Sequence, residues 1–431
     1  MTIMWEGTKF SKAKVLWGQT EDLEFETIAE SFEIDNKKAP KSRRIFKAVL
    51  KNLSADTTYF YKIKMGPLKG KRYHFKTSPK SPRNFSFLLM SDAQHGHKIT
   101  KRVIKESVRK YAFDEYEDKE LYPLSFMAFP GDLVQYGSSY KRWKKEFFGP
   151  LAPILPFLAL YPAIGNHEEN DKLYFQYFDL PQNGTPKYME HWYYVDHGNV
   201  RLISLDTNRG YRIKAQLKWL ESVLEETKKN PSIDFVFGEF HHPHESELWL
   251  KGNTEYSGEL IKRFEDFTRE TKIPTAHFCG HTHGYSRGHS FEVNHTMLTV
   301  ASVGGDVDDW GDYAQRDYLN FTKSFAEFGW LLAKVETGRD PKVHFTRYSF
   351  GTDQKPGDRG IVDTFTIKRY NQLPQKPKII SPNNQTIAGR NDVIFKISNF
   401  VDLDGDGQLT THIQFFENRN DISKPIKEKI V

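Results

Sequence analysis

Residues 124–137, LSFMAFPGDLVQYG, run from an apolar segment directly into a polar loop. Residues 124–129 have the nearly continuous apolar character of a strand that is covered on both faces. Asp132 follows where this strand ends, next to Gly131. In α/β sheets, ligands bind in the crevice at the carboxyl ends of strands, because loops converge there while the strands hold them in place. The stretch therefore predicts an α/β fold with a functional carboxylate at Asp132.

The same pattern continues on both sides of this stretch. Further buried strands are expected at residues 85–90, 200–205, 234–238 and 275–278. Apolar residues at helical spacing predict helices at residues 98–112, 140–148, 214–226 and 258–270. Late strands at residues 330–335 and 343–348 close the domain near residue 370. The alternation of strands and helices indicates one α/β domain over residues 83–370.

The flanking regions have a different character. Residues 1–80 contain short alternating segments such as 13–17, 46–50 and 59–64, which is typical of a small β sandwich. The stretches KTSPKSPRN (76–84) and LPQKPKIISP (373–382) are predicted to be linkers. Residues 378–431 contain two or three strand-like runs and are predicted to be part of a third β domain that is cut short.

An acidic loop in this last region has the oxygen spacing of a calcium loop. Its members are Asp402, Asp404 and Asp406, but Ile413 stands where the closing glutamate of such a loop is expected. An ordinary turn is therefore favoured over a calcium site.

Composition narrows the class of protein. A chain of 431 residues exceeds the size at which one core keeps growing, so more than one domain is expected. No apolar run is long enough for a transmembrane helix. The net charge is +6, and the densest basic cluster, at residues 37–44, is interpreted as a solvated face, so no nucleic-acid partner is expected. The single cysteine, Cys279, excludes an intramolecular disulfide and is expected to be an inert core thiol.

The first ten residues, MTIMWEGTKF, lack the charged and apolar regions of a signal peptide. Two interpretations stay open. Either the sequence begins inside a domain, or this is the genuine start of the chain. The cellular compartment is therefore not decided by the composition.

Five short motifs begin where apolar strands run into polar loops. They are SDAQHG (91–96), PGDLVQYG (130–137), IGNHEE (164–169), EFHHPH (239–244) and CGHTHGYSR (279–287). Taken singly, each Asp or His is explained by a turn or by packing. Together they bring oxygen and nitrogen donors of the kind that suit Zn, Fe or Mn to successive strand ends. These candidate donors are Asp92, Gln94, Asp132, Asn166, His241, His281 and His283.

The series D-x-[HQ], GD, GNH[DE], H-x-P and GHxH resembles the calcineurin-like metallophosphoesterases, over about residues 83–350. With a β domain in front, the architecture looks most like that of the purple acid phosphatases. The resemblance implies a four-layer α/β/β/α sandwich for residues 83–370. It also implies a fibronectin type III-like β domain for residues 1–80 and a partial immunoglobulin-like domain for residues 378–431.

The resemblance also implies two divalent metal ions, which would be Fe, Zn or Mn. One ion would be held by Asp92, Gln94, Asp132 and His283. The other would be held by Asp132, Asn166, His241 and His281, with Asp132 bridging the pair. His167 would stand beside the leaving group as a catalytic residue. Because Gln135 occupies the position of the purple enzymes' tyrosinate, a coloured ferric centre is not expected.

Two further residues are candidates for substrate contacts, His242 and Arg287, although a structural salt bridge is an equally good explanation for Arg287. The expected activity is hydrolysis of a small phosphomonoester. A phosphodiesterase acting on nucleotides or lipid headgroups is the close alternative. A binding or adhesion protein with an inactive phosphatase-like domain is the alternative from another class. The resemblance favours a secreted or periplasmic location, and it leaves the oligomeric state open.

Overall fold

The computed structural model describes residues 1–8, 13–66, 68–80, 82–371, 374–382, 394–402, 411–417 and 425–430. The chain divides into two compact units, Met1–Arg369 and Tyr370–Val431. In the second unit, β21 (Ile379–Ser381) pairs with β22 (Lys396–Ile397), and β23 (His412–Phe415) pairs with β24 (Lys427–Ile430). Of the acidic loop, Asp404 and Asp406 lie outside the described residues, so the choice between a turn and a calcium site stays a prediction.

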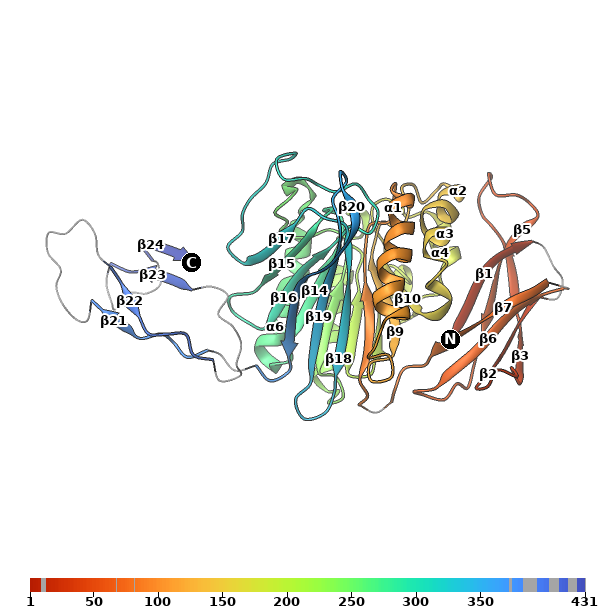
Figure 1. Cartoon of the computed structure of the whole chain (residues 1–431), viewed down its shortest axis with the longest axis horizontal. Coiled ribbons are helices and arrows are strands. Elements are labelled where there is room, and N and C mark those ends of the chain that lie inside the picture. Colours follow the sequence, from red (N-terminus) through yellow and green to blue (C-terminus); the bar gives the residue numbers. More distant parts are fainter. Residues whose placement is uncertain are drawn as a thin grey trace. The chain divides into compact units, whose positions relative to one another are not determined.

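The N-terminal region of the first unit is built from two antiparallel sheets (Figure 1). The first sheet contains β1 (Thr2–Thr8), β5 (Arg43–Val49) and β4 (Glu30–Glu33), in that order. The second contains β3 (Phe25–Ile28), β2 (Ala13–Gly18), β6 (Thr58–Met65) and β7 (Leu68–Lys76). Tyr59 and Tyr61 are only 2% and 5% exposed and pack with Val15, Trp17 and Phe75. The alternating aromatic residues of β6 therefore point inward, as the sequence predicted.

The central region contains a six-stranded sheet. Its order is β10 (Ala159–Ala163), β9 (Leu124–Pro130), β8 (Phe85–Leu89), β18 (Gly329–Glu336), β19 (Lys342–Gly351) and β20 (Pro356–Lys368). Strands β8, β9 and β10 are parallel, whereas β18, β19 and β20 are antiparallel to their neighbours. The carboxyl ends of β8, β9 and β10 therefore lie together at one edge of the sheet.

A second sheet of seven strands faces the first. Its order is β11 (Tyr193–His197), β12 (Val200–Ser204), β13 (Phe235–Glu239), β14 (Thr275–Cys279), β16 (His295–Val300), β15 (Tyr285–His289) and β17 (Phe321–Phe325). One apolar cluster joins the two sheets, with Phe87 and Phe126 from the first and Phe237 and Phe278 from the second. The rings of Phe87 and Phe237 are 6.3 Å apart between centroids. These strands are apolar along their whole length because both faces are covered.

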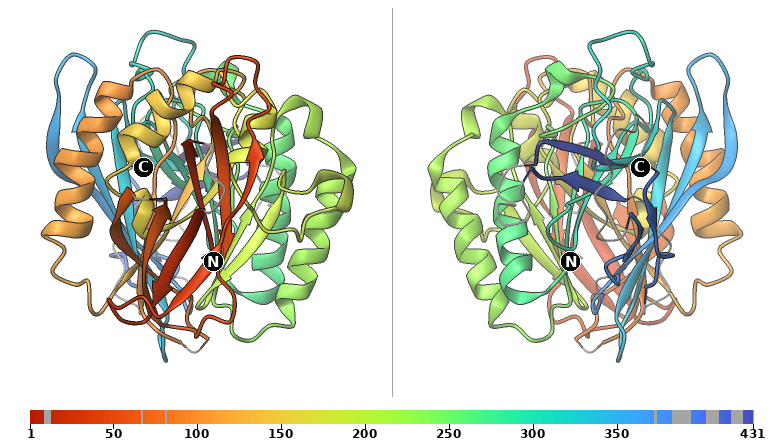
Figure 2. Two further views of the ribbon diagram at one scale, coloured as in Figure 1. Left: turned by 90° about the vertical axis from the view of Figure 1, so that its right-hand side faces the viewer. Right: turned by 90° about the vertical axis from the view of Figure 1, so that its left-hand side faces the viewer.

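Helices cover the outer faces of both sheets (Figures 1 and 2). Three helical segments lie on the six-stranded sheet. The first is α1 (His97–Arg102), which continues in π-helical turns to Asp114. The others are α2 (Tyr140–Arg142), which continues through Phe148 to α3 (Gly149–Leu151), and α4 (Lys172–Tyr177). On the seven-stranded sheet lie α5 (Lys214–Lys228) and α6 (Glu255–Thr271). Short 3-10 turns occur at Leu155–Phe157, Pro186–Tyr188, Arg209–Tyr211 and Leu250–Gly252.

The α6 helix shows why these segments are helical. Its apolar residues Leu260, Phe264 and Phe267 recur at helical spacing, and each is buried against the seven-stranded sheet. The layers run helix, sheet, sheet, helix, which confirms the predicted four-layer α/β/β/α sandwich. Within the described residues, no helix combines the length and the apolar character that crossing a bilayer requires.

Candidate metal centre

The candidate donors lie in loops at the carboxyl ends of five strands. Asp92 and Gln94 follow β8, Asp132 follows β9, Asn166 follows β10, His241 follows β13, and His281 and His283 follow β14. The carboxylate and amide donors thus come from the six-stranded sheet, and the three histidines come from the seven-stranded sheet. Parallel pairing within each sheet places these strand ends side by side.

The backbone at three of these positions is held in the left-handed region. The φ angle is 58° at Asp92, 57° at Asp132 and 70° at His281. A residue other than glycine pays about 1–3 kcal/mol for such a conformation, so it persists only where the surrounding structure fixes it. Strained residues of this kind cluster at functional sites.

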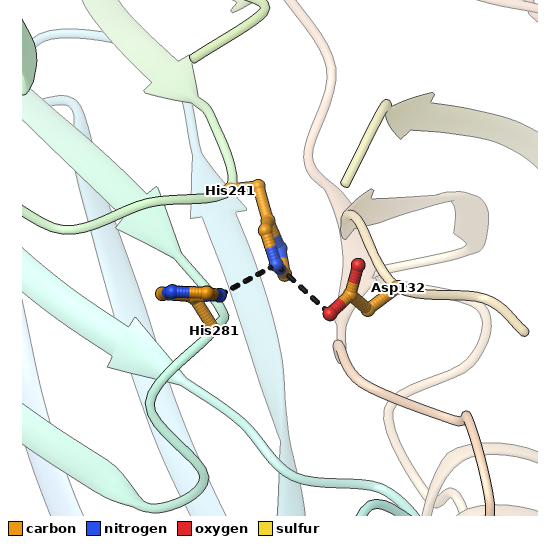
Figure 3. A group of neighbouring side chains, drawn as sticks. All are labelled: Asp132, His241 and His281. Atoms are coloured by element: carbon orange, nitrogen blue, oxygen red, sulfur yellow. Dashed lines mark hydrogen bonds and ion pairs between the residues drawn. The ribbon is translucent and has the colours of Figure 1, made fainter. Parts of the chain in front are cut away.

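The first cluster of donors centres on His241. Its Nε2 lies 3.0 Å from Asp132 Oδ2, 3.0 Å from Asn166 Oδ1 and 3.2 Å from His281 Nδ1. Figure 3 shows His241 between the other two labelled side chains. The Nδ1 of His241 donates to the carbonyl oxygen of Pro130 at 2.9 Å, so in the neutral ring Nε2 carries a lone pair. Lone pairs from carboxylate, amide and imidazole then point at one another, which is the arrangement that a shared cation stabilises.

The second cluster centres on His283. Its Nδ1 is 2.5 Å from the carbonyl oxygen of Asp306, and its Nε2 is 3.3 Å from Asp92 Oδ1 and 2.9 Å from Gln94 Nε2. Gln94 Nε2 is in turn 3.3 Å from Asp132 Oδ2. The Oε1 of Gln94 is buried and has no hydrogen-bond partner within the described chain. A half-turn of the amide would direct this oxygen at the cluster, where it could ligate a cation.

Asp132 Oδ2 belongs to both clusters, because it contacts His241 on one side and Gln94 on the other. Among the described residues, Asp132, His241 and His281 form a group that could hold a metal ion, because their ligand atoms all lie within 4.8 Å of one another. The donor set therefore fits two cations that share the Asp132 carboxylate.

Two glycines let the chain come this close. A Cβ atom at Gly165 would lie 2.2 Å from Asp132 Oδ1, and one at Gly280 would lie 2.4 Å from Asp92 Oδ2. Both distances are shorter than any van der Waals contact, so only glycine permits the approach.

Positive charge stabilises the buried carboxylates of the two donor clusters. Burial by itself raises the pKa of Asp132, but the imidazoles of His241 and His167 lower it below its ordinary value. Burial lowers the pKa of His241, yet the neighbouring Asp132 carboxylate raises it to about 9. Without a metal, protons on histidine balance the buried carboxylates, and a metal would take their place.

Glu168 has a role that the sequence did not reveal. This fully buried carboxylate accepts hydrogen bonds from the backbone N–H groups of Asp132 at 2.9 Å, Leu133 at 2.7 Å and Gly165 at 2.7 Å. It ties the loop after β9 to the loop after β10. The only sequence signal was its place in IGNHEE, because the loop that it holds lies some 36 residues away.

His167 lies at the edge of the clusters. Its backbone N–H donates to Asp132 Oδ1 at 2.9 Å, and its Nδ1 donates to the carbonyl oxygen of Gln135 at 2.9 Å. Its Nε2 is 3.8 Å from Asp132 Oδ2, and the side chain is 30% exposed. The ring therefore combines proximity to the clusters with access to solvent, and it is not one of the converging donors.

His242 packs against the clusters without joining them. Its ring lies 4.3 Å from the ring of His281 between centroids, and its Nδ1 is 3.0 Å from Thr207 Oγ1. Burial and the neighbouring histidines His281 and His241 lower the pKa of His242 well below its ordinary value. The ring is therefore neutral.

Arg287 does not reach the clusters. Its guanidinium makes a two-point contact with Asp363, with Nε 2.7 Å from Oδ2 and Nη2 3.1 Å from Oδ1, and the residue is 8% exposed. The structure supports the salt-bridge alternative over the predicted substrate contact. The arginine near His242 is instead Arg212, whose Nε donates to the carbonyl oxygen of Thr207 at 2.8 Å. Within the described residues, Arg212 forms no ion pair with a carboxylate.

Two regions of the chain match known protein families. Residues 85–285 match the calcineurin-like phosphoesterase family, and residues 1–77 match the purple acid phosphatase N-terminal domain. Two uncharacterized proteins of Mycobacterium tuberculosis, from strains CDC 1551 / Oshkosh and H37Rv, are each 24% identical over 290 residues. The match covers 61% of this chain and 54% of theirs, so the chain spans about half the length of these curated relatives.

Two solved structures share the fold. A purple acid phosphatase from yellow lupin (Lupinus luteus) seeds aligns with a TM-score of 0.64 at 16% identity, over 85% of this chain and 71% of its own. PhoD aligns with a TM-score of 0.53 at 11% identity, over 82% of this chain and 86% of its own. The chain therefore contains a calcineurin-like phosphoesterase domain over residues 85–285, behind a purple acid phosphatase N-terminal domain over residues 1–77.

Proposed function

We propose that this protein hydrolyses small phosphomonoesters at a centre of two divalent metal ions. The observation that carries the proposal is that one buried oxygen, Asp132 Oδ2, belongs to two separate donor clusters. A carboxylate in that position can bridge two cations. Paired metals of this kind are a common device for phosphate-ester hydrolysis.

We assign the ligands of the two metals as the resemblance to the calcineurin-like metallophosphoesterases implies. Asp92, Gln94, Asp132 and His283 would hold one ion, and Asp132, Asn166, His241 and His281 would hold the other. The mixture of oxygen and nitrogen donors suits Zn, Fe or Mn. When bound, the ions supply Lewis-acid stabilisation of phosphate charge and a source of hydroxide near neutral pH.

We assign His167 the role of delivering a proton to the leaving oxygen. Because its Nδ1 is held by the carbonyl oxygen of Gln135, its Nε2 is the nitrogen left for this task. The partly exposed side chain lies at the edge of the clusters, and we place the leaving group beside it. We assign the neighbouring Arg212 and His242 the role of binding phosphate oxygens.

Phosphate release from metal-loaded protein tests the proposal. We expect Zn-, Mn- or Fe-loaded protein to hydrolyse p-nitrophenyl phosphate and to retain about two metal ions per chain by plasma mass spectrometry. Protein that binds no metal after dialysis and releases no phosphate would instead support a binding or adhesion role with an inactive phosphatase-like domain.

The choice between monoester and diester depends on the substrate, because both reactions use the same centre. A phosphodiesterase acting on nucleotides or lipid headgroups therefore stays the second candidate. Comparing kcat/KM for p-nitrophenyl phosphate and for bis(p-nitrophenyl) phosphate separates the two. A higher value for the bis ester would overturn the monoesterase assignment.

We propose a secreted or periplasmic location, by resemblance to purple acid phosphatases. Fractionation of the source cells with an antibody to this chain tests it. Recovery of the protein in the cytosol alone would contradict the proposal.

A further inference from the structure

An aromatic surface extends from the candidate metal centre to solvent. The ring of Trp249 lies 5.0 Å from the ring of His281, and the ring of Tyr313 lies 5.9 Å from that of Trp249, both between centroids. Tyr313 is 50% exposed. We call Trp249 and Tyr313 the aromatic wall. It places an open aromatic face about two ring contacts away from a proposed metal ligand.

The loop that carries Tyr313 is fixed on both sides of the centre. At one end, the backbone N–H of Asp308 donates to the carbonyl oxygen of His283 at 2.9 Å, and the N–H of His283 donates to Asp308 Oδ2 at 2.8 Å. At the other end, the N–H of Leu250 donates to the carbonyl oxygen of Ala314 at 3.1 Å. The loop therefore spans from His283 of one donor cluster to the neighbour of Trp249, which packs on His281 of the other. Tyr313 is held at the rim of the centre.

The ring of Trp249 also packs closely against the backbone of Gly252. A Cβ atom at Gly252 would lie 2.9 Å from Trp249 Cε3 and 3.1 Å from His281 Cδ2. The backbone of Gly252 thus fills the angle between the two rings and sets the direction of Trp249. The wall is fixed in place by this packing and does not depend on a loose side chain.

The rim of the centre has two chemically different parts. His281 contacts His242, next to Arg212, and it separately contacts Trp249. A phosphate group suits the part beside Arg212, because a guanidinium binds phosphate oxygens. A flat, uncharged group suits the aromatic wall, because planar rings stack on aromatic side chains.

We propose that the aromatic wall makes this protein selective for phosphate esters whose organic group carries a planar aromatic ring, such as a nucleoside or a phenol. The proposal rests on the proposed function and adds the substrate class to it. A stacking contact of this kind changes affinity by about tenfold.

The test compares two esters whose leaving groups are both primary alcohols. Adenosine 5′-monophosphate and ribose 5-phosphate both release phosphate from a primary hydroxyl, and they differ by the planar base. We expect Tyr313→Ala to lower kcat/KM about tenfold for adenosine monophosphate and less than twofold for ribose 5-phosphate. Tyr313→Phe should restore the difference, because it keeps the ring. Phe291→Ala is the matched control, since Phe291 is similarly exposed and lies in the turn that follows β15.

A second pair of esters distinguishes a nucleoside from a phenol as the source of the planar ring. Phenyl phosphate and cyclohexyl phosphate have rings of similar size, and only the first is planar. If Tyr313→Ala lowers turnover of phenyl phosphate as well as of adenosine monophosphate, the wall accepts any planar ring. An effect on adenosine monophosphate alone narrows the substrate class to phosphate esters of nucleosides. Equal effects on all four esters, or no effect on any, overturn the proposal.

Calorimetry with adenosine gives a readout that does not depend on turnover. We expect wild type to bind adenosine more tightly than ribose and Tyr313→Ala to lose that difference. If metal-loaded wild type hydrolyses none of the esters, the proposed function fails, and the adenosine titration still decides whether the wall exists as a binding surface. Equal binding of adenosine by wild type and Tyr313→Ala overturns it.

Discussion

At the scale of the residue, the proposed metal centre depends most on Asp132. Its Oδ2 contacts both His241 and Gln94. We expect Asp132→Asn to remove metal binding and phosphate release together, because a neutral amide cannot supply a bridging charge. Metal analysis and a phosphate assay check this. Asp266→Asn, an exposed carboxylate on α6, is the control. An Asp132→Asn protein with its metals and activity intact would refute the assignment.

His167 should behave differently from the ligands, because it lies outside the converging donors. We expect His167→Ala to keep its metal content and to lose activity by a factor of roughly 100 or more. The loss should be larger for an alkyl ester than for p-nitrophenyl phosphate, because the poorer leaving group needs the proton more. The measurement is kcat for both esters beside metal content. His344→Ala, on β19, is the control, and a uniform loss accompanied by lost metal would make His167 a ligand instead.

At the scale of the element, a pair of buried histidines lies on adjacent strands of the seven-stranded sheet. His295 on β16 contacts Thr275 Oγ1 through Nδ1 at 2.7 Å and His277 Nδ1 through Nε2 at 2.9 Å. Burial lowers the pKa of His295 to about 3, and burial with His295 and His244 nearby lowers the pKa of His277 well below its ordinary value. Both rings are therefore neutral in the folded protein at neutral pH.

These histidines predict that acid weakens the domain. In the unfolded chain, a histidine takes up a proton below about pH 6.5. In the folded protein, His295 stays neutral down to about pH 3. Its contribution to the free energy of unfolding is therefore constant above about pH 6.5 and falls as the pH drops from about 6.5 to about 3. The free energy of unfolding should drop by on the order of 1 kcal/mol per pH unit for each such histidine. Urea unfolding at pH 7 and pH 5 measures this. His295→Gln should make the free energy of unfolding depend less on pH. His344→Gln, which replaces a more exposed histidine, should leave the dependence unchanged. An unchanged slope in His295→Gln would contradict the prediction.

Strand ends were the part of the site that the sequence could predict. Asp92 and Asp132 each follow a short apolar run, and that local pattern alone places them at the carboxyl edge of a sheet. The same local pattern could not show that Arg287 meets Asp363, because 76 residues separate them and the contact depends on packing between two sheets. The sequence did not predict the contact between Trp249 and Tyr313 for the same reason. The two rings meet only where the loop that carries Tyr313 folds back onto residues 249 and 250.

At the scale of the whole molecule, the N-terminal β region is joined to the central region through Glu6 on β1. Its carboxylate accepts hydrogen bonds from Tyr140 at 2.6 Å, from Tyr177 at 3.0 Å and from Arg43 at 2.6 Å. Tyr140 and Tyr177 belong to α2 and α4 of the central region. One charged side chain therefore connects a strand of one region to two helices of the other.

We expect the two regions to unfold together in a single transition. Glu6→Ala should lower the free energy of unfolding by about 2–4 kcal/mol, because hydrogen bonds to a charged group are lost and their partners are left behind. Calorimetry of the full chain measures it. Glu26→Ala, an exposed carboxylate paired with Lys14 on the outer side of the β region, should have little effect. Two separate transitions in wild type would show that the regions are independent.

The division of the donors between the two sheets has a consequence for how the protein is kept folded. Each cation bound by the proposed ligands would connect the six-stranded sheet to the seven-stranded sheet, so metal binding would also stabilise the packing of the two sheets. Free metal at 100 times its dissociation constant adds about 2.7 kcal/mol to the folded state. If the proposed ligand sets are correct, the concentration of free metal would set the stability of the sandwich as well as its activity.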